Sequence, residues 1–149
     1  TVGNDPADMT LHCAASFGSG IQAREIDDPG WVTIVADDRG QLCGFAQLRP
    51  DAPKACVAAA RPSELYRLYV DDRWHGRGIA QQLMDEVMRS AARAGSDRMW
   101  LGVWEKNLRA LAFYRKYGFE VVGDHVFQFG TDAQTDLIMA ANVGGSASA

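Results

Sequence analysis

Hydrophobic and polar residues alternate with two different periods along this chain, one typical of strands and one typical of helices. Residues 31–36 and 41–48 are two apolar runs on either side of a short polar turn, which predicts a β-hairpin. Residues 64–70 alternate as well, but neither face is fully polar, so we expect a strand that is covered on both sides. In residues 78–94 the apolar positions recur every three to four residues, which predicts an amphipathic helix that Gly95 ends.

The rest of the chain supplies the remaining elements. Residues 9–25 are expected to be helical, with Gly18-Ser19-Gly20 dividing them into two short helices, and residues 49–63 are expected to form a loop. Beyond the amphipathic helix the pattern predicts a strand, a helix and three further strands, at 98–104, 107–116, 119–122, 126–129 and 136–140. Gly123 and Asp124 are expected to form a turn. This order predicts an α/β domain with a mixed sheet.

Length and composition indicate one domain of an ordinary globular kind. The chain has 149 residues, of which we assign 1–143 to the domain, with 1–8 frayed. Residues 144–149 are rich in glycine and serine and are expected to be disordered. The net charge of −4 argues against a general nucleic-acid surface. Because the chain shows neither a signal-peptide pattern nor an apolar run of about 18 residues, we expect a cytoplasmic protein.

The cysteines and histidines show no spacing that is typical of a metal site. Cys13, Cys43 and Cys56 are odd in number, and we expect them to be reduced thiols. His12 stands beside Cys13, but neighbouring residues on a helix point in different directions, so a buried structural thiol is favoured over a nucleophile with its base. No metal is therefore expected.

The junction between the strand at 64–70 and the helix after it carries the most chemical information. The connecting loop contains Gly76 and Gly78 and opens directly into the helix, so backbone N–H groups gather at the positive end of the helix dipole, where phosphate groups bind. Glycine has no Cβ, which lets a bulky anion approach the main chain. On glycine spacing alone, an ordinary tight turn explains the segment equally well.

Three segments in this order resemble the GNAT superfamily of N-acetyltransferases. Residues 64–70 resemble its bulged central strand, and His75-Gly-Arg-Gly-Ile-Ala80 its pyrophosphate loop. Asn107-Leu-Arg-Ala-Leu-Ala-Phe-Tyr-Arg-Lys-Tyr-Gly-Phe119 resembles its Asn-x-x-Ala-x-x-x-Tyr-x-Lys-x-Gly-Phe element. The resemblance covers about residues 64–122, and the hairpin at 31–48 extends it. It implies a single domain whose mixed, mostly antiparallel sheet is flanked by helices and has splayed central strands.

The sequence departs from this family pattern at two places. His75 stands where the family more often has Arg or Gln, but the loop acts mainly through its backbone, so we expect the substitution to be tolerated. Family members usually begin with a strand before the first helix, and this chain leaves little room for one. We therefore expect part of the sheet edge to be missing, on the side that concerns the acceptor.

The resemblance implies acetyl-CoA as the acetyl donor. Its pyrophosphate would lie on the N–H groups of residues 75–80, with Arg73 and Arg77 neutralising charge, and its pantetheine arm would pair with residues 68–70 like an added strand. The N–H of Val70 or Tyr69 would stabilise the oxyanion. Asn107 would bind the pantetheine or the loop, or cap the helix, or do both. The implied donor-binding residues are Leu68, Tyr69, Val70, His75, Gly76, Arg77, Gly78, Ile79, Ala80, Asn107 and Lys116.

Two residues are candidates for acid–base chemistry. Tyr114 aligns with the family's general acid. A phenol suits this role because its pKa is near 10, so it stays protonated at neutral pH and can protonate the departing thiolate. The alternative is a core aromatic beside Phe113 and Tyr117. Glu64 stands where some family members place a base acting through water, and a solvated carboxylate at a strand end remains an equal alternative. Glu105 is a second candidate base.

The acceptor is expected to be a small amine. Trp104, Trp31 and Glu105 are the candidate acceptor contacts, because an indole face attracts an ammonium group. Trp100 is expected in the core and Trp74 at the surface. Residues 100–105, 127–130 and 135–139 are similar to the subgroup that contains bacterial spermidine/spermine N-acetyltransferases, which implies a polyamine.

Three alternative functions remain open at this point. The acceptor can instead be a protein or peptide amine, or an aminoglycoside-like compound. A third alternative is a non-catalytic module that binds acyl-CoA, although the presence of Tyr114 argues against it. The expected partner is a small-molecule amine rather than nucleic acid or a membrane, and a homodimer is left open.

Overall fold

The computed structural model describes residues 10–16 and 21–143. Within these residues eight strands form one sheet in the order β1-β2-β3-β4-β5-β6-β8-β7. The strands are β1 (Thr10–Ser16), β2 (Ile21–Asp28), β3 (Trp31–Asp38), β4 (Gln41–Arg49), β5 (Pro62–Val70), β6 (Arg98–Trp104), β7 (Glu120–Phe129) and β8 (Asp132–Asn142). The helices are the short η1 (Asp72–Trp74), α1 (Ile79–Arg93) and α2 (Leu108–Lys116). The expected frayed residues 1–8, the break at 18–20 and the tail at 144–149 lie outside the described residues.

All neighbouring strands of this sheet run antiparallel except β5 and β6, which run parallel. The parallel pair exists because α1 lies between its two strands in the chain and returns it to the same end of the sheet. This arrangement confirms the mixed, mostly antiparallel α/β fold that the sequence predicts. None of the helices in the described part of the chain is long and apolar enough to cross a membrane.

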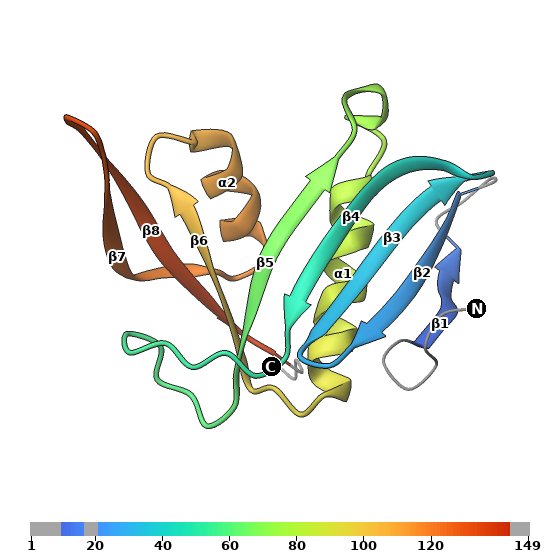
Figure 1. Ribbon diagram of the computed structural model, residues 1–149, viewed down its shortest axis with the longest axis horizontal. Helices are drawn as coiled ribbons and strands as arrows, with labels where there is room; N and C mark the ends of the chain where they lie inside the picture. The colour runs from blue at the N-terminus through green and yellow to red at the C-terminus, as the bar shows by residue number, and fades with distance from the viewer. Residues whose placement is uncertain (1–9, 17–20, 144–149) are drawn as a thin grey trace.

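The two central strands pair at one end and then separate. Residues Pro62, Ser63 and Glu64 of β5 pair with Arg98, Met99 and Trp100 of β6. Beyond these positions β5 and β6 diverge, as Figure 1 shows, while β5 remains paired with β4 as far as Val70. Residues 65–70 therefore have one strand edge that faces away from any neighbouring strand, and the predicted splay of the central strands is confirmed.

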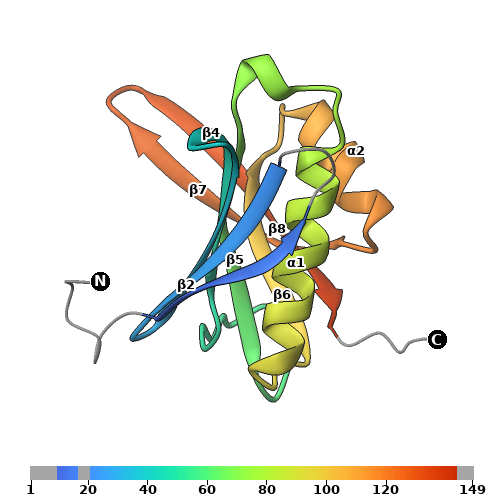
Figure 2. The same cartoon turned by 90° about the vertical axis from the view of Figure 1, so that its right-hand side faces the viewer.

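Helix α1 forms the main core with the strands that it covers. Its apolar stripe buries Leu83, Met84 and Val87 completely, and it packs against β3, β4 and β5. Burying one such side chain fully contributes about 1.5–3 kcal/mol, so this stripe is enough to fix the helix on the sheet. Figure 2 shows α1 and α2 on the same side of the sheet. On the opposite face, Ala52 and Val57 of the long β4–β5 loop cover a smaller apolar cluster around Trp100, Ile138 and Ala140.

The helical prediction for residues 9–25 is wrong. Residues 10–16 and 21–28 form β1 and β2, which pair antiparallel and extend the sheet beyond β3. In β2 the burial alternates with the period of a strand, with Ala23 and Glu25 buried and Arg24 exposed. Pairing with β3 therefore overrides the local helical propensity. The expectation of a missing sheet edge is wrong for the same reason, because β1 and β2 supply that edge.

Two bulges interrupt the strands, and the family resemblance implies the first of them, in β5. In β5 the register shifts opposite Gln47 and Leu48, so Tyr66 is an extra residue and the alternation expected through residues 64–70 breaks there. The turn predicted at Gly123 and Asp124 is wrong, because β7 continues through both residues with a register shift before Gly123. Glycine fits at position 123 because a Cβ there would lie 2.8 Å from the Cys56 sulfur.

Candidate active site

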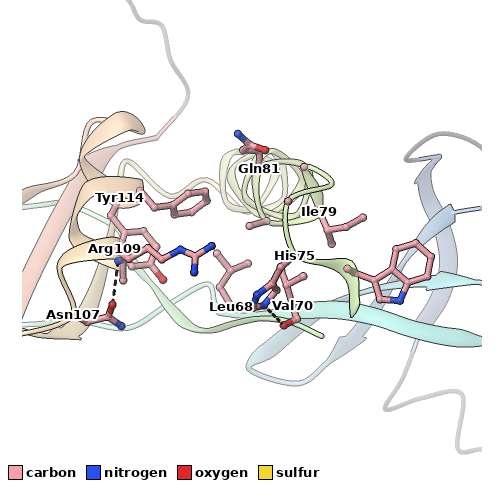
Figure 3. Close-up of a pocket in the computed structure, with 14 residues that line it drawn as sticks. Leu68, Val70, His75, Ile79, Gln81, Asn107, Arg109 and Tyr114 are labelled. Atoms are coloured by element: carbon pink, nitrogen blue, oxygen red, sulfur yellow. Dashed lines mark hydrogen bonds between the residues drawn. The ribbon is translucent and has the colours of Figure 1, made fainter. Parts of the chain in front are cut away.

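A cavity of about 520 Å³ lies where the open edge of β5, the beginning of α1 and one face of α2 meet. Figure 3 shows the side chains of Leu68, His75, Arg109 and Tyr114 around it. Its lining residues are Leu68, Val70, Trp74, His75, Gly76, Gly78, Ile79, Ala80, Gln81, Asn107, Arg109, Ala110, Phe113 and Tyr114. The splay of β5 from β6 thus creates the space, and the two helices bound it.

The loop from β5 to α1 presents unpaired backbone donors to this cavity. Gly76 and Gly78 both have a φ of 78°, which a residue with a side chain rarely adopts. Gly78 is the N-cap residue of α1 and provides no side-chain cap, so the first N–H groups of the helix lack an intrahelical partner. A Cβ at position 76 would meet nothing within 4 Å, so the main chain is open to a ligand there. This combination fits a pyrophosphate.

The polar side chains of this loop are already held by neighbouring groups. Asp71 accepts a hydrogen bond from the Arg73 N–H, which begins η1, and also binds the Arg73 side chain at 3.2 Å. These two contacts hold the pKa of the Asp71 carboxyl below its usual range. The Arg77 guanidinium lies 4.7 Å over the ring of Trp74. Trp74 is buried rather than at the surface as expected, because it packs in the main core.

The register of β4 and β5 determines which backbone amides of β5 face the cavity. The Asp71 N–H donates to the Cys43 carbonyl at 2.8 Å, and Gly44 stands opposite Val70. In an antiparallel pair this places Gly44 and Val70 at a position without mutual hydrogen bonds. The N–H groups of Val70 and Leu68 therefore point away from β4, toward the open edge. Tyr69, opposite Phe45, directs its N–H to β4 instead.

Tyr114 lies on the cavity side of α2. Its ring is half-buried between Phe113, at 5.5 Å between ring centroids, and Phe119, at 5.8 Å. Burial raises the pKa of the Tyr114 phenol above its ordinary value of 10.0, so it carries its proton throughout the neutral range. Tyr114 is thus both an aromatic contact of the core and a proton donor facing the cavity.

Other residues of α2 complete this wall of the cavity. The Asn107 side chain caps the helix by accepting from the Ala110 N–H at 3.2 Å, and it also lines the cavity. Arg109 and Phe113 were not among the predicted site residues. Ala110, also not predicted, lies four positions before Tyr114, and Arg109 lies four positions before Phe113, so this helical spacing was the signal that could have linked them. Arg109 adds a positive charge to this wall.

Glu64 stands at the point where β5 and β6 separate, outside the lining of the cavity. It is opposite Trp100 in the parallel pair, and Arg49 binds its carboxylate at 3.3 Å. Burial raises the pKa of Glu64, and the charges of Arg49 and Lys54 partly oppose this rise. The carboxyl is therefore held near the cleft in a form that takes up a proton more readily than an exposed glutamate.

The structure does not gather all predicted residues around one space. Fourteen lining residues include most of the predicted donor-binding set, but the remaining predicted residues lie elsewhere: Tyr69, Arg77, Lys116, Glu64, Trp104, Glu105 and Trp31. Trp104 is at the end of β6 and is 45% exposed. Trp31 packs edge-on against Tyr66 at 5.1 Å, and the Arg49 guanidinium lies 5.4 Å over its ring.

The described residues contain no group of three His, Cys, Asp or Glu side chains that could hold a metal ion. Cys43 and Cys56 are free thiols, and burial raises the pKa of Cys43. The side chains of His12 and Cys13 are not among those that the structure describes.

Comparisons with known proteins agree with this geometry. Residues 7–119 match the Acetyltransferase (GNAT) family. An uncharacterized N-acetyltransferase of Mycobacterium tuberculosis is 36% identical over 135 residues, which are 90% of this chain and 81% of that protein. The L-amino acid N-acetyltransferase AaaT of Escherichia coli is 33% identical over 104 residues, 68% of this chain and 61% of that protein.

A solved structure relates the fold to the donor. The PaiA N-acetyltransferase from Thermoplasma acidophilum, crystallised in complex with coenzyme A, superposes with a TM-score of 0.58 at 25% identity, over 76% of this chain and 61% of that chain. The cavity of the present chain, with its glycine loop, open strand edge and half-buried tyrosine, fits the same ligand chemistry. The chain belongs to the Acetyltransferase (GNAT) family and is an acetyl-CoA-dependent N-acetyltransferase.

Proposed function

We propose that this enzyme transfers the acetyl group directly from acetyl-CoA to a small primary amine, without an acetylated enzyme intermediate. The observation that carries the proposal is the arrangement around one cavity of three groups that the reaction needs. These are the N-terminus of α1 for the pyrophosphate, the outward N–H of Val70 for the carbonyl oxygen, and Tyr114 for the leaving thiolate.

Each of these groups has one task in the transfer. The amine lone pair attacks the thioester carbonyl carbon, a C–N bond forms, and the Val70 N–H stabilises the negative charge that develops on the carbonyl oxygen. The C–S bond then breaks, and its electrons leave with sulfur. Tyr114 donates its proton to that thiolate and is reprotonated from solvent. Arg109 and the amides at the start of α1 hold the phosphates.

The amine must lose a proton before it attacks. An alkyl ammonium with a pKa of about 10.4 is less than ~0.1% neutral at pH 7, so a base is needed. Glu64 lies at the last paired position before β5 and β6 separate, and its pKa is raised. Both properties suit it to accept this proton through water. A small amine is favoured over a protein substrate because an L-amino acid N-acetyltransferase is among the relatives with an acceptor in their names.

The test measures thiol release from acetyl-CoA with a panel of amines, acetyl-CoA binding by calorimetry, and the acetylated product by mass spectrometry. We expect turnover with at least one small amine and initial rates whose double-reciprocal lines intersect, because both substrates bind before any product leaves. Parallel lines would replace direct transfer by a covalent intermediate. Tight acetyl-CoA binding without turnover on any amine would indicate a non-catalytic binding module instead.

A further inference from the structure

The indole rings of this protein mostly have a cation of the protein itself beside them. Three tryptophans have a protein cation within 5.4 Å of the ring centroid: Trp31 with Arg49, Trp74 with Arg77, and Trp100 with Lys54. Trp31 is connected to Glu64 through Arg49, and Trp100 stands opposite Glu64 in the β5–β6 pair, so the rings on either side of Glu64 already carry a cation of the protein. A polycationic acceptor would therefore meet positive charge at these rings. Among the described residues Trp104 has no such cation.

Trp100, Trp104 and Glu64 share the face of the sheet opposite α1. Trp100 and Trp104 alternate along β6 with Leu101 and Val103, whose side chains pack in the α1-side core. Glu64 is level with Trp100 in the parallel pair and so lies on the same face as Trp100. Donor cavity and acceptor face are thus separated by the open edge of β5.

A continuous run of contacts crosses this face from Glu64 to Arg67. Arg49 binds Glu64 and also lies over Trp31, and Trp31 packs against Tyr66. At the end of the run the Arg67 guanidinium lies 5.2 Å over the ring of Tyr66. Arg49 therefore has a carboxylate partner. Arg67 is exposed and has no carboxylate within 4.0 Å among the residues that the structure describes.

Arg67 also lines a second hollow, which shares one lining residue with the donor cavity. This hollow of about 430 Å³ is lined by Phe45, Arg67, Leu68 and Tyr69, and the rings of Phe45 and Tyr69 lie 5.4 Å apart. Leu68 lines both spaces, so the two lie on either side of the same stretch of β5. It combines a guanidinium without a carboxylate partner with an aromatic wall.

We propose that the acceptor amine also carries a carboxylate, as an α-amino acid does, and that Arg67 binds this carboxylate. The inference rests on the proposed acetyl transfer and specifies its acceptor. A guanidinium offers two parallel N–H groups to a carboxylate, which fixes the substrate in one orientation. Phe45 and Tyr69 contact the apolar part of the substrate. Arg49 and Lys54 make the surrounding face unfavourable for polyamines.

The experiment compares kcat/KM for amino acids with kcat/KM for the amines that lack only the carboxylate. The pairs are phenylalanine with phenethylamine, leucine with isoamylamine, and lysine with cadaverine. Spermidine is measured as a polyamine without a paired amino acid. We expect the amino acid of at least one pair to exceed its amine by about tenfold or more. Arg67→Met should remove about ten- to a hundredfold of kcat/KM for that amino acid, mainly through KM, because a charge-assisted pair is lost. It should leave the rate with the matched amine and the Kd of acetyl-CoA unchanged.

Arg61→Gln is the matched control, because Arg61 is exposed just before β5 and its removal changes the net charge equally. We expect it to change neither rate, and Arg67→Lys to recover part of the preference. Equal kcat/KM for both members of every pair, or a preference that Arg67→Met leaves intact, would overturn the inference while the proposed acetyl transfer stands. Absence of turnover with every compound would overturn both.

Discussion

The imidazole of His75 binds the last carbonyl of β5, with His75 Nε2 2.9 Å from the Val70 oxygen. Because a carbonyl only accepts, the Nε2 atom carries the proton in this contact. The same residue, Val70, directs its N–H to the open edge where the thioester carbonyl would lie. His75 thus joins the loop that would hold the pyrophosphate to the strand end that would hold the acetyl group, as Figure 3 shows.

Removal of this contact should weaken donor binding. We expect His75→Ala to raise the Kd of acetyl-CoA by about three- to tenfold, since a hydrogen bond of this kind contributes roughly 0.5–1.5 kcal/mol. His75→Gln should stay near the wild-type Kd, because its amide N–H can reach the same carbonyl. Calorimetry with acetyl-CoA measures both. Equal weakening by the two variants would show that the ring packs against the ligand and that its hydrogen bond is unimportant.

Tyr114→Phe should lower kcat by about 10²–10⁴-fold with little change in the Kd of acetyl-CoA, because only the proton donor is lost. Tyr117→Phe is the matched control one turn away, where the hydroxyl donates to the Gln81 carbonyl at 3.2 Å. We expect Tyr117→Phe to keep wild-type kcat. A Tyr114→Phe enzyme with unchanged kcat would leave this residue with a packing role alone.

The raised pKa of Tyr114 also predicts the alkaline side of the pH profile. Since burial favours the neutral phenol, Tyr114 remains a proton donor up to and beyond the ordinary value of 10.0. We therefore expect kcat with saturating substrates to show no loss from this group between about pH 8 and about pH 10. A fall of kcat in that range in the wild type that vanishes in Tyr114→Phe would contradict the direction of the shift.

The raised pKa of Glu64 predicts how activity changes with pH on the acidic side of the pH profile. A base acts only when deprotonated, so activity should rise with pH through the raised pKa of Glu64, at a higher pH than for an exposed glutamate. In Glu64→Gln we expect lower kcat/KM and no such rise, whereas Glu120→Gln, at an exposed position, should keep the wild-type profile. An unchanged profile in Glu64→Gln would assign proton removal to another group or to water alone.

The raised pKa of Glu64 also affects stability, but in the opposite direction to activity: the contribution of Glu64 to the free energy of unfolding falls as pH rises. Because the folded state raises the pKa of Glu64, it favours the protonated carboxyl, and this contribution is present at low pH and lost as pH rises through the folded-state value. The free energy of unfolding of Glu64→Gln relative to wild type should therefore move in favour of the variant from about pH 4 to about pH 8. Denaturant unfolding at both pH values measures it. A change in the other direction would mean that the Arg49 pair outweighs burial.

The sequence predicted the part of the fold that local pattern encodes. The stripe of α1 and the loop before it depend on neighbours within one or two turns, so residues 75–94 could be read directly. The segment at 10–28 could not, because its strands exist through pairing with β3 and through contacts of Glu25 with α1. The family resemblance implied a bulge in β5, but its position at Tyr66, like the bulge at Val122 of β7, depends on the partner strand in the same way.

In the candidate site too, residues of short sequence motifs could be predicted, whereas those that depend on strand pairing could not. Tyr114, Asn107 and the glycine loop belong to short motifs, and the structure places them around one cavity. To assign the oxyanion-stabilising N–H to Val70 and not to Tyr69 required the pairing register of β5 with β4, which the sequence of β5 alone does not contain. Arg49 could not be predicted because the ring beneath it, Trp31, is on another strand, and Arg67 could not because the bulge at Tyr66 determines which face its side chain shares.

Gly44 shows how closely β4 and β5 approach at the site. A Cβ at this position would lie 2.4 Å from the Tyr69 carbonyl oxygen, an atom of the main chain that cannot rotate away. We expect Gly44→Ala to destabilise the protein by about 1–3 kcal/mol and to weaken acetyl-CoA binding by displacing Val70. Gly102→Ala is the control on β6, where the nearest atom is 3.8 Å away, and its unfolding midpoint should stay near wild type.

A buried polar contact connects β2, at the edge of the sheet, to α1. Glu25 is buried, and it accepts from Ser90 at 2.8 Å and from Arg93 at 2.9 Å, whereas the Arg93 side chain is 55% exposed. Arg93→Met removes a charge-assisted hydrogen bond from a buried carboxylate, but Glu25→Gln leaves an arginine that water can reach. We expect Arg93→Met to cost more stability, about 1–3 kcal/mol, than Glu25→Gln, as measured by urea unfolding. The reverse order would show that the Glu25 carboxylate contributes to stability without Arg93.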